Sequence, residues 1–427
     1  MSQQPTWFGQ PRGLTVLFLT NMWEQFSYYG MRALLVYYMT KQLLISQGQS
    51  SVIYGAYTAT AYFTPIIGGV IADRYLGKRR AVIIGASIMA AGHFMMAFET
   101  MFYLALATIA LGNGLFLPSL PSQINDLYKS GDPRRGWAYN VYYVGINIGG
   151  FLAPLICGTL GELYGWHYGF GAAGIGMVAG LLIYLSGQRY LPPEPPRKLA
   201  VPVGPSKVHL GRETILALVA IALAVTVFRG AYEQVGNTVA LWADAGVDRQ
   251  AGAFVIPMTW FISLNPLFVI MMTPPLLAYW SRRAAQGHDQ APARRMALGA
   301  LIVAAAYLML AVAAWLSGSS AAPWAWLFAF FIIFTFGELF ILPTGLGLFA
   351  RLAPPGMGAT TVAAWFLAIF SGSLAAGFVG TLWGDMSHAA FFGLLAGLAT
   401  IAAILLRLLD PFVQRVDKAR IEGAESD

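Results

Sequence analysis

The sequence has few charged residues and almost no cysteine. Only 11% of its 427 residues are Asp, Glu, Lys or Arg, whereas a soluble protein has about a quarter. This deficit excludes an ordinary soluble enzyme, a disordered chain and a nucleic-acid-binding protein. The single cysteine, Cys157, excludes an internal disulfide and a dithiol metal site. The sequence has no metal-ligand spacing and no Walker-type glycine-rich loop, so we expect no metal, no cofactor and no ATP-driven activity.

Hydrophobic residues, in contrast, make up 57% of the chain and gather in long runs. A membrane-spanning helix needs about 20 mostly apolar residues. The runs predict an all-α membrane protein with twelve transmembrane helices in two six-helix halves. We expect the helices at residues 14–43, 52–76, 80–98, 101–120, 137–160, 168–186, 213–242, 254–281, 294–316, 323–350, 360–384 and 389–409.

The basic residues are distributed unevenly between the predicted loops. With the amino terminus in the cytoplasm, 22 of the 26 Lys and Arg residues lie on that side, and only Lys41 and Arg249 lie on the other. This agrees with the positive-inside rule and with an even number of spans. We therefore expect a multi-pass protein of the cell (inner) membrane with both termini in the cytoplasm. The net charge of +7 is then a topology signal rather than a sign of nucleic-acid binding.

A proline-rich stretch divides the predicted helices into two equal groups. It covers about 187–212 and predicts a cytoplasmic linker between the bundles 1–186 and 213–427. Two packed six-helix bundles resemble the major facilitator superfamily, in which substrate binds between the halves. The loop after the second helix resembles that superfamily's acidic and basic signature loop. Its Asp73 and Arg74 are candidates for a conformational latch.

Five ionisable residues lie inside predicted spans: Glu24, Arg32, Arg229, Glu233 and Glu338. Because a charge in the bilayer is costly, each one indicates a functional site. Arg229 and Glu233 have i,i+4 spacing and share a helix face, which also fits a structural ion pair. Glu338 is either a buried, protonated structural acid or a group that faces a cavity; the Pro and Gly residues after it favour a cavity.

Residues 21–32, with the sequence NMWEQFSYYGMR, resemble the first-helix signature of the proton-dependent oligopeptide transporter family, Glu-x-x-Glu-Arg-Phe-x-Tyr-Tyr-Gly. Similar stretches follow in the family's order along the whole chain. They are Tyr62-Phe-Thr-Pro65, Tyr142-Tyr143-x-x-Ile146-Asn147, Glu233-Gln234-x-Gly236, Trp260-Phe-x-Ser-Leu-Asn265-Pro266, Gly337-Glu338-Leu339 and Trp365-Phe-Leu.

The resemblance implies a monomeric symporter that moves di- and tripeptides or peptide-like solutes inward with protons, using the proton gradient. It implies a substrate pocket lined by Tyr29, Arg32, Tyr62, Tyr143, Asn147, Gln234, Asn265, Glu338 and Trp365. Glu338 would bind the substrate's amino terminus, and Arg32 would pair with Glu233 at the extracellular gate. Proton coupling and gating would then involve Glu24, Arg32, Glu233 and Glu338.

The chain departs from the family at one charge cluster. The first signature Glu is Asn21, the signature Arg is Gln25, and the Lys of the fourth helix is Leu117. The three charges are absent together, which avoids an electrostatic penalty, because losing only some of them would leave a buried charge unpaired. Glu24 is the remaining member, and desolvation favours its neutral form. We hypothesise that the positive charge facing the substrate has moved to Arg229, which we add to the substrate-binding residues.

Two other functions stay open at this point. Since the peptide carboxylate clamp is missing, the chain could be a transporter or facilitator of another small organic solute. A non-transporting membrane sensor would bind the same ligands without moving them.

Overall fold

The computed structural model describes residues 6–7, 9–129, 132, 134–194, 211–287, 290–352 and 358–426. The chain divides into two compact units. Unit 1 comprises residues 1–44 and 60–201, and unit 2 comprises 45–59 and 202–427. Residues 195–210, which form most of the predicted linker, lie outside the described part, so the domain boundaries stay a prediction.

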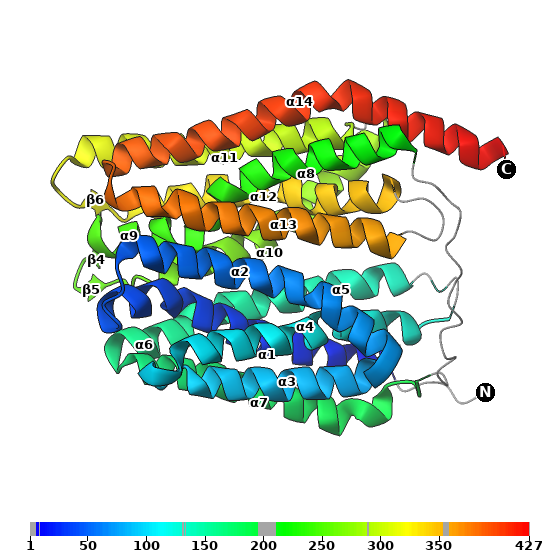
Figure 1. Ribbon diagram of the computed structural model, residues 1–427, viewed down its shortest axis with the longest axis horizontal. Helices are drawn as coiled ribbons and strands as arrows, with labels where there is room; N and C mark the ends of the chain where they lie inside the picture. Colours follow the sequence, from blue (N-terminus) through cyan, green and yellow to red (C-terminus); the bar gives the residue numbers. More distant parts are fainter. Residues whose placement is uncertain are drawn as a thin grey trace. The chain divides into compact units, whose positions relative to one another are not determined.

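Unit 1 is a bundle of helices that run side by side (Figure 1). Within it, α1 packs against α5 and α7, and α3 packs against α4 and α7. Its elements are β1 (Thr6–Trp7), β2 (Gln10–Pro11), α1 (Arg12–Tyr37), η1 (Tyr38–Gln42), the later part of α2 (Gln47–Ile71), η2 (Ala72–Leu76), α3 (Lys78–Met95), η3 (Glu99–Met101), α4 (Phe102–Asp126), α5 (Arg134–Ala153), η4 (Pro154–Gly158), α6 (Thr159–Leu163), α7 (Trp166–Gly187) and η5 (Gln188–Tyr190).

Unit 2 contains the early part of α2 and all later elements. Within it, α11 packs against α12 and α14, α8 packs against α13 and α14, and α10 packs against α12. The elements are α8 (Arg212–Tyr232), η6 (Glu233–Gly236), α9 (Thr238–Ala245), β3 (Val247–Asp248), β4 (Gln250–Ala251), β5 (Phe254–Val255), α10 (Trp260–Ala285), α11 (Pro292–Ser317), β6 (Ala322–Pro323), α12 (Ala325–Leu352), α13 (Gly358–Thr381), η7 (Leu382–Gly384) and α14 (His388–Ser426).

The described residues include three two-residue strand pairs, all in segments outside the helices. β1 pairs with β2 and β4 with β5 in antiparallel fashion, and β3 pairs with β6 in parallel. The β4–β5 hairpin turns at Gly252, whose φ of +68° suits glycine. It explains one difference from the sequence prediction. The helix expected at 254–281 begins only at Trp260, because the hairpin and Pro257 occupy the preceding residues.

Glycines allow the closest contacts between neighbouring helices. A Cβ at Gly85 of α3 would lie 2.7 Å from the Gly112 carbonyl oxygen of α4, and a Cβ at Gly299 of α11 would lie 2.6 Å from the Gly337 carbonyl oxygen of α12. Small residues at contacts are typical of helices packed in a bilayer, where close backbone approach replaces the hydrophobic driving force.

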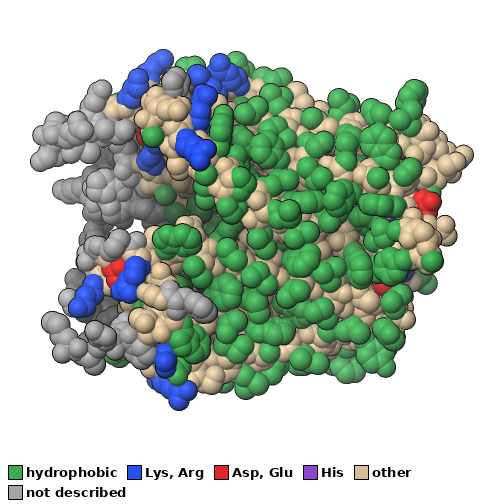
Figure 2. Space-filling view, turned by 180° about the vertical axis from the view of Figure 1, so that it is seen from behind, with side chains coloured by type: hydrophobic (Ala, Val, Ile, Leu, Met, Phe, Trp, Pro, Cys, Tyr) green, Lys and Arg blue, Asp and Glu red, His purple; other side chains and the backbone are tan. Residues whose placement is uncertain are grey.

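Nine helical segments in the described part of the chain are long and apolar enough to cross a membrane. The other three predicted segments are helical too, as α1, α2 and α3. Figure 2 shows hydrophobic side chains over the broad face of each unit, with Lys and Arg side chains at one end of each unit. The chain is therefore a multi-pass membrane protein.

Candidate functional site

Glu338 lies at the centre of a polar cluster formed by three helices of unit 2. Its side chain, on α12, is 8% exposed. The Tyr232 hydroxyl of α8 donates a hydrogen bond to Oε1 at 2.7 Å, and Nδ2 of Asn265 on α10 donates to Oε2 at 2.6 Å. Asn265 also donates to the Thr335 hydroxyl at 3.1 Å. Both carboxylate oxygens therefore have a donor, as a buried acid requires.

Arg229 and Glu233 form an ion pair one helical turn apart, with side chains 2% and 1% exposed. The Arg229 guanidinium also lies 3.4 Å from the Ser373 hydroxyl of α13 and 4.8 Å from the centre of the Tyr232 ring. Tyr232 thus contacts both Arg229 and Glu338 and connects these two side chains within unit 2.

The helix predicted at 213–242 breaks at Glu233, where α8 gives way to the tighter turn η6. A backbone carbonyl near the end of α8 accepts a hydrogen bond from another helix: the Tyr307 hydroxyl of α11 donates to the Ala231 carbonyl at 2.7 Å. Such a side-chain donor compensates for a hydrogen bond that the helix loses at its end. The break places Glu233 at a helix terminus, which the continuous apolar sequence does not indicate.

Gln234, predicted to line the pocket, is fully buried and bonded on both sides of its amide. Nε2 donates to the carbonyls of Gly230 and Ala376, and Oε1 accepts from Asn237 and Thr238. These bonds tie η6 to α13. A direct role for Gln234 in binding substrate stays a prediction.

The early part of α2 packs against α13 and also contacts Asn237, next to η6. Ser51 donates to Oδ1 of Asn237 at 3.2 Å, and Gln47 donates to the Gly380 carbonyl at 2.8 Å. One turn further along α2, a Cβ at Gly55 would lie 2.5 Å from the Cα of Gly377 on α13. Backbone therefore meets backbone at this contact.

Trp365, the last predicted pocket residue of unit 2, is 3% exposed on α13. Its ring packs edge-on against Phe349 at 5.3 Å and against the backbone of Gly345, where a side chain would clash. Gly345 follows Pro343, so the weakened part of α12 accommodates the indole.

In unit 1, the side-chain amides of Gln25 and Asn21 both donate hydrogen bonds within the helix bundle. Gln25 donates to Oε2 of the buried Glu24 at 2.7 Å. Asn21 donates to the Tyr142 carbonyl of α5 at 3.3 Å. An amide therefore lies beside the Glu24 carboxyl group. That it replaces a guanidinium of the family signature stays a prediction.

The other predicted residues of unit 1 differ in exposure. Asn147 is 6% exposed and donates to the Tyr143 carbonyl at 3.0 Å, while the Tyr143 side chain is 39% exposed. The rings of Tyr28 and Tyr29 meet edge-on at 5.5 Å. Arg32 and Tyr62 are partly buried and take part in further interactions. Arg32 belongs to unit 1 and Glu233 to unit 2, and their pairing stays a prediction.

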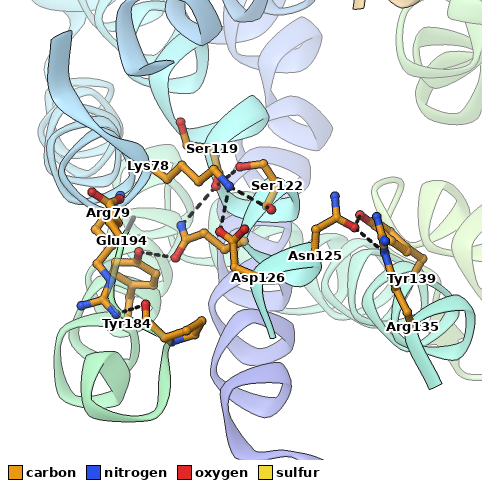
Figure 3. A network of polar contacts seen from close by, with 12 residues as sticks. Lys78, Arg79, Ser119, Ser122, Asn125, Asp126, Arg135, Tyr139, Tyr184 and Glu194 are labelled. Atoms are coloured by element: carbon orange, nitrogen blue, oxygen red, sulfur yellow. Dashed lines mark hydrogen bonds and ion pairs between the residues drawn. The ribbon is translucent and has the colours of Figure 1, made fainter. Parts of the chain in front are cut away.

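The signature loop of unit 1 makes contacts through its basic end. Asp73 and Arg74 are exposed in η2, and their role as a latch stays a prediction. Lys78 pairs with Asp126 of α4 at 2.7 Å (Figure 3). The Arg79 guanidinium donates to the carbonyls of Leu191 and Pro192. These bonds hold the ends of α3, α4 and η5 together.

Sequence reasoning missed Tyr232, Thr335 and Ser373 as partners of the buried charges. The sequence could have indicated Tyr232, because it directly precedes Glu233 and follows Arg229 by three residues. The other two hydroxyls resemble ordinary helix residues in the sequence. Among the described residues, no group of His, Cys, Asp and Glu could hold a metal ion.

Known proteins share both the sequence and the fold. The POT family profile matches residues 79–203 and 206–395. The peptide transporter YePEPT of Yersinia enterocolitica is 30% identical, with 95% of each chain covered. A di-/tripeptide transporter of Lactococcus lactis subsp. cremoris is 29% identical, over 95% of this chain and 96% of the relative. The crystal structure of a peptide transporter POT in complex with sulfate superposes with a TM-score of 0.89 at 29% identity and covers 97% of both chains.

Proposed function

Because the chain belongs to the POT family of transporters, we propose that it is a secondary active transporter carrying di- and tripeptides or peptide-like solutes inward together with protons. Twelve transmembrane helices, cytoplasmic termini and a monomeric state complete the proposal. The two bundles would alternate access to a site near the middle of the membrane. The protein is a transporter and not an enzyme.

The Glu338 cluster is the observation that carries this proposal. A carboxylate in a buried position binds the ammonium group of a peptide far more strongly than it would in water. Tyr232 and Asn265 hold both of its oxygens, which fixes the carboxylate before the substrate arrives. Such preorganisation reduces the entropy lost on binding.

A peptide's carboxylate needs a different partner, and here the chain offers less positive charge than its family signature. Gln25 and Leu117 are neutral, and Arg229 forms an ion pair with Glu233. This favours a second candidate substrate class within the same proposal: amine-bearing solutes without a free carboxylate. Comparing an amidated dipeptide with the free acid separates the two classes.

The site is tested by replacing Glu338 with glutamine, which keeps the shape and removes the charge. We expect dialanine binding to weaken by about tenfold or more, because a hydrogen bond to a charged group contributes about 1.5–3 kcal/mol. N-acetyl-dialanine lacks the ammonium group, so the wild type and Glu338→Gln should bind it equally. Glu99→Gln, an exposed acid outside this cluster, is the matched control. Equal binding of dialanine by the wild type and Glu338→Gln would refute the assigned role.

Coupling is tested in liposomes with and without an imposed pH gradient. A symporter accumulates dialanine only with the gradient, whereas a facilitator merely equilibrates it. A sensor would bind dialanine without any uptake. The buried Glu24 is our candidate proton carrier in unit 1, so Glu24→Gln should abolish gradient-driven accumulation and leave equilibration intact.

A further inference from the structure

Unit 2 contains an apolar groove between α11 and α14, two helices that pack against each other. Its volume of about 420 Å³ falls within the range of ligand pockets, roughly 300–1,000 Å³. Its apolar walls are Ala297, Leu298, Leu301, Ala403, Ile404 and Leu408. Leu301 is 48% exposed, Ile404 52% and Leu408 71%. Because both helices are long and apolar enough to span a membrane, these exposed side chains lie against lipid.

Two arginines line one end of this groove and share one buried carboxylate. Arg294 of α11 donates to Oδ2 of Asp410 through Nε at 3.2 Å and Nη2 at 2.9 Å, and Arg407 of α14 donates to the same oxygen through Nη1 at 3.2 Å. Gln414 donates to Oδ1 at 2.9 Å. Asp410 is 1% exposed, whereas the arginine side chains are 51% and 57% exposed. The carboxylate therefore holds two accessible guanidinium groups side by side.

The cluster of Arg294, Arg407 and Asp410 has two positive charges and one negative charge, so its net charge is +1. None of the described residues that line the groove is acidic. A guanidinium has five N–H donors, and the bonds to Asp410 use two of Arg294 and one of Arg407. Arg294 also lies in the first turn of α11, whose N-cap residue Ala291 has no capping side chain. The positive end of the helix dipole adds to the attraction for an anion.

This basic end lies at the depth of lipid headgroups. The helix α14 begins at His388 and reaches Arg407 19 residues later, a rise of about 28 Å, which is close to the hydrocarbon thickness of about 30 Å. Arg294 is the third residue of α11. Basic side chains near the ends of spans extend to the membrane interface. Leu301 and Ile404 lie on the hydrocarbon side of both arginines, at the depth of the acyl chains.

We propose that this groove binds an anionic phospholipid, with its phosphate at Arg294 and Arg407 and an acyl chain along the apolar walls. Guanidinium groups bind phosphate oxygens through charge-assisted, paired hydrogen bonds. The single negative charge of phosphatidylglycerol balances the net charge of the cluster, whereas the cationic headgroup of phosphatidylcholine cancels that gain. Basic pockets between transmembrane helices bind anionic headgroups in this way. The site is separate from the Glu338 cluster, which is formed by α8, α10 and α12.

Native mass spectrometry of the delipidated, full-length protein tests the proposal. The protein is titrated with phosphatidylglycerol and with phosphatidylcholine of identical acyl chains. We expect the wild type to retain phosphatidylglycerol about fivefold more strongly. Arg407→Gln makes the cluster neutral and should remove this preference, while Arg294 still pairs with the buried Asp410.

Arg415→Gln is the matched control, because it removes an exposed positive charge of the same helix outside the groove. It should keep the preference for phosphatidylglycerol. Three results overturn the proposal: equal retention of both lipids by the wild type, an undiminished preference in Arg407→Gln, or an equal loss in Arg415→Gln.

A second variant tests the apolar walls independently of the arginines. Leu301→Trp fills the groove and leaves the charges in place, so retention of phosphatidylglycerol should fall. Leu308→Trp, at an exposed position of the same helix outside the groove, should leave it unchanged. Unchanged retention in Leu301→Trp would place the lipid elsewhere and overturn the proposal.

Inorganic phosphate separates a lipid site from a site for a free anion. It has no acyl chain, so it should not raise the melting temperature of the delipidated protein. If phosphate stabilises the protein as much as phosphatidylglycerol does, the arginines bind a free anion and the lipid assignment is wrong.

Discussion

Gly55→Ala is the sharpest test of how residues 45–59 and α13 work together. A Cβ at this position would lie 2.5 Å from the Cα of Gly377, 2.7 Å from its nitrogen and 2.8 Å from the Ser373 carbonyl oxygen. All three are backbone atoms, which cannot rotate away. Carbon atoms in contact prefer about 3.5–4.0 Å, so the two segments must separate by about 1 Å.

The cost follows from the contacts that this separation breaks. Overpacking a tight contact costs about 1–3 kcal/mol. The bond from Ser51 to Asn237, already 3.2 Å long, and that from Gln47 to the Gly380 carbonyl would stretch beyond bonding distance, which costs about 0.5–1.5 kcal/mol each. The packed arrangement loses at least about 2 kcal/mol, which is about 30-fold in its population.

A disulfide reports that population directly. A Cβ at Gly48 would lie 3.8 Å from the Cβ of Thr381, the typical separation in a disulfide, about 3.8 Å. Gly48→Cys/Thr381→Cys should therefore cross-link readily, in a background in which Cys157 is serine. Adding Gly55→Ala should lower the initial rate of cross-linking by up to about 30-fold.

Peptide uptake then distinguishes a fixed contact from one that opens. If the segments separate during transport, the cross-link stops uptake and a reductant restores it. If the packing is static, uptake continues and Gly55→Ala only lowers the melting temperature. The control is Gly48→Ala, whose new methyl meets Thr381 at an ordinary 3.8 Å. Equal cross-linking rates with and without Gly55→Ala would refute the steric reasoning.

Three further predictions rest on the charged groups. Arg229→Gln should lower stability by about 3–5 kcal/mol, since it removes one partner of a buried pair, and thermal unfolding measures this. Arg229→Gln/Glu233→Gln should recover part of that loss; a double variant less stable than the single one would show that the two side chains do not stabilise each other. If Arg229→Gln left uptake of zwitterionic peptides unchanged, the hypothesis that Arg229 faces the substrate would be wrong. Arg79→Gln should cost about 1 kcal/mol or more through two lost hydrogen bonds, whereas the exposed Arg80→Gln should cost almost nothing.

Local sequence patterns predicted most of the helices, because each span of a bilayer requires a continuous run of apolar residues. Each predicted span corresponds to a helix, although several boundaries differ. The α10 boundary differed because the β4–β5 hairpin forms from apolar residues such as Phe254 and Val255, which hydropathy alone assigns to the span. Residues after 409 continue α14 as far as Ser426, and the helix passes through Pro411.

The candidate site was only partly predictable. Glu338 stands out because an acid inside an apolar run is rare, and the i,i+4 spacing of Arg229 and Glu233 indicates their pairing. Tyr232 and Asn265 are 106 and 73 residues from Glu338. Their contact depends on how α8, α10 and α12 are rotated against one another, which no local pattern contains. The same limit applies to Gln234, whose amide turned out to be bonded inside unit 2.

The sequence by itself determined that this is a multi-pass membrane transporter of the POT family, because hydropathy, charge placement and motif order are written along the chain. Only the tertiary structure decided which groups surround Glu338, where α8 ends, and that residues 45–59 contact α13 backbone to backbone. These features arise from side chains far apart in sequence. The packing of whole helices against one another determines such contacts, whereas hydropathy predicts only where the helices lie in the sequence.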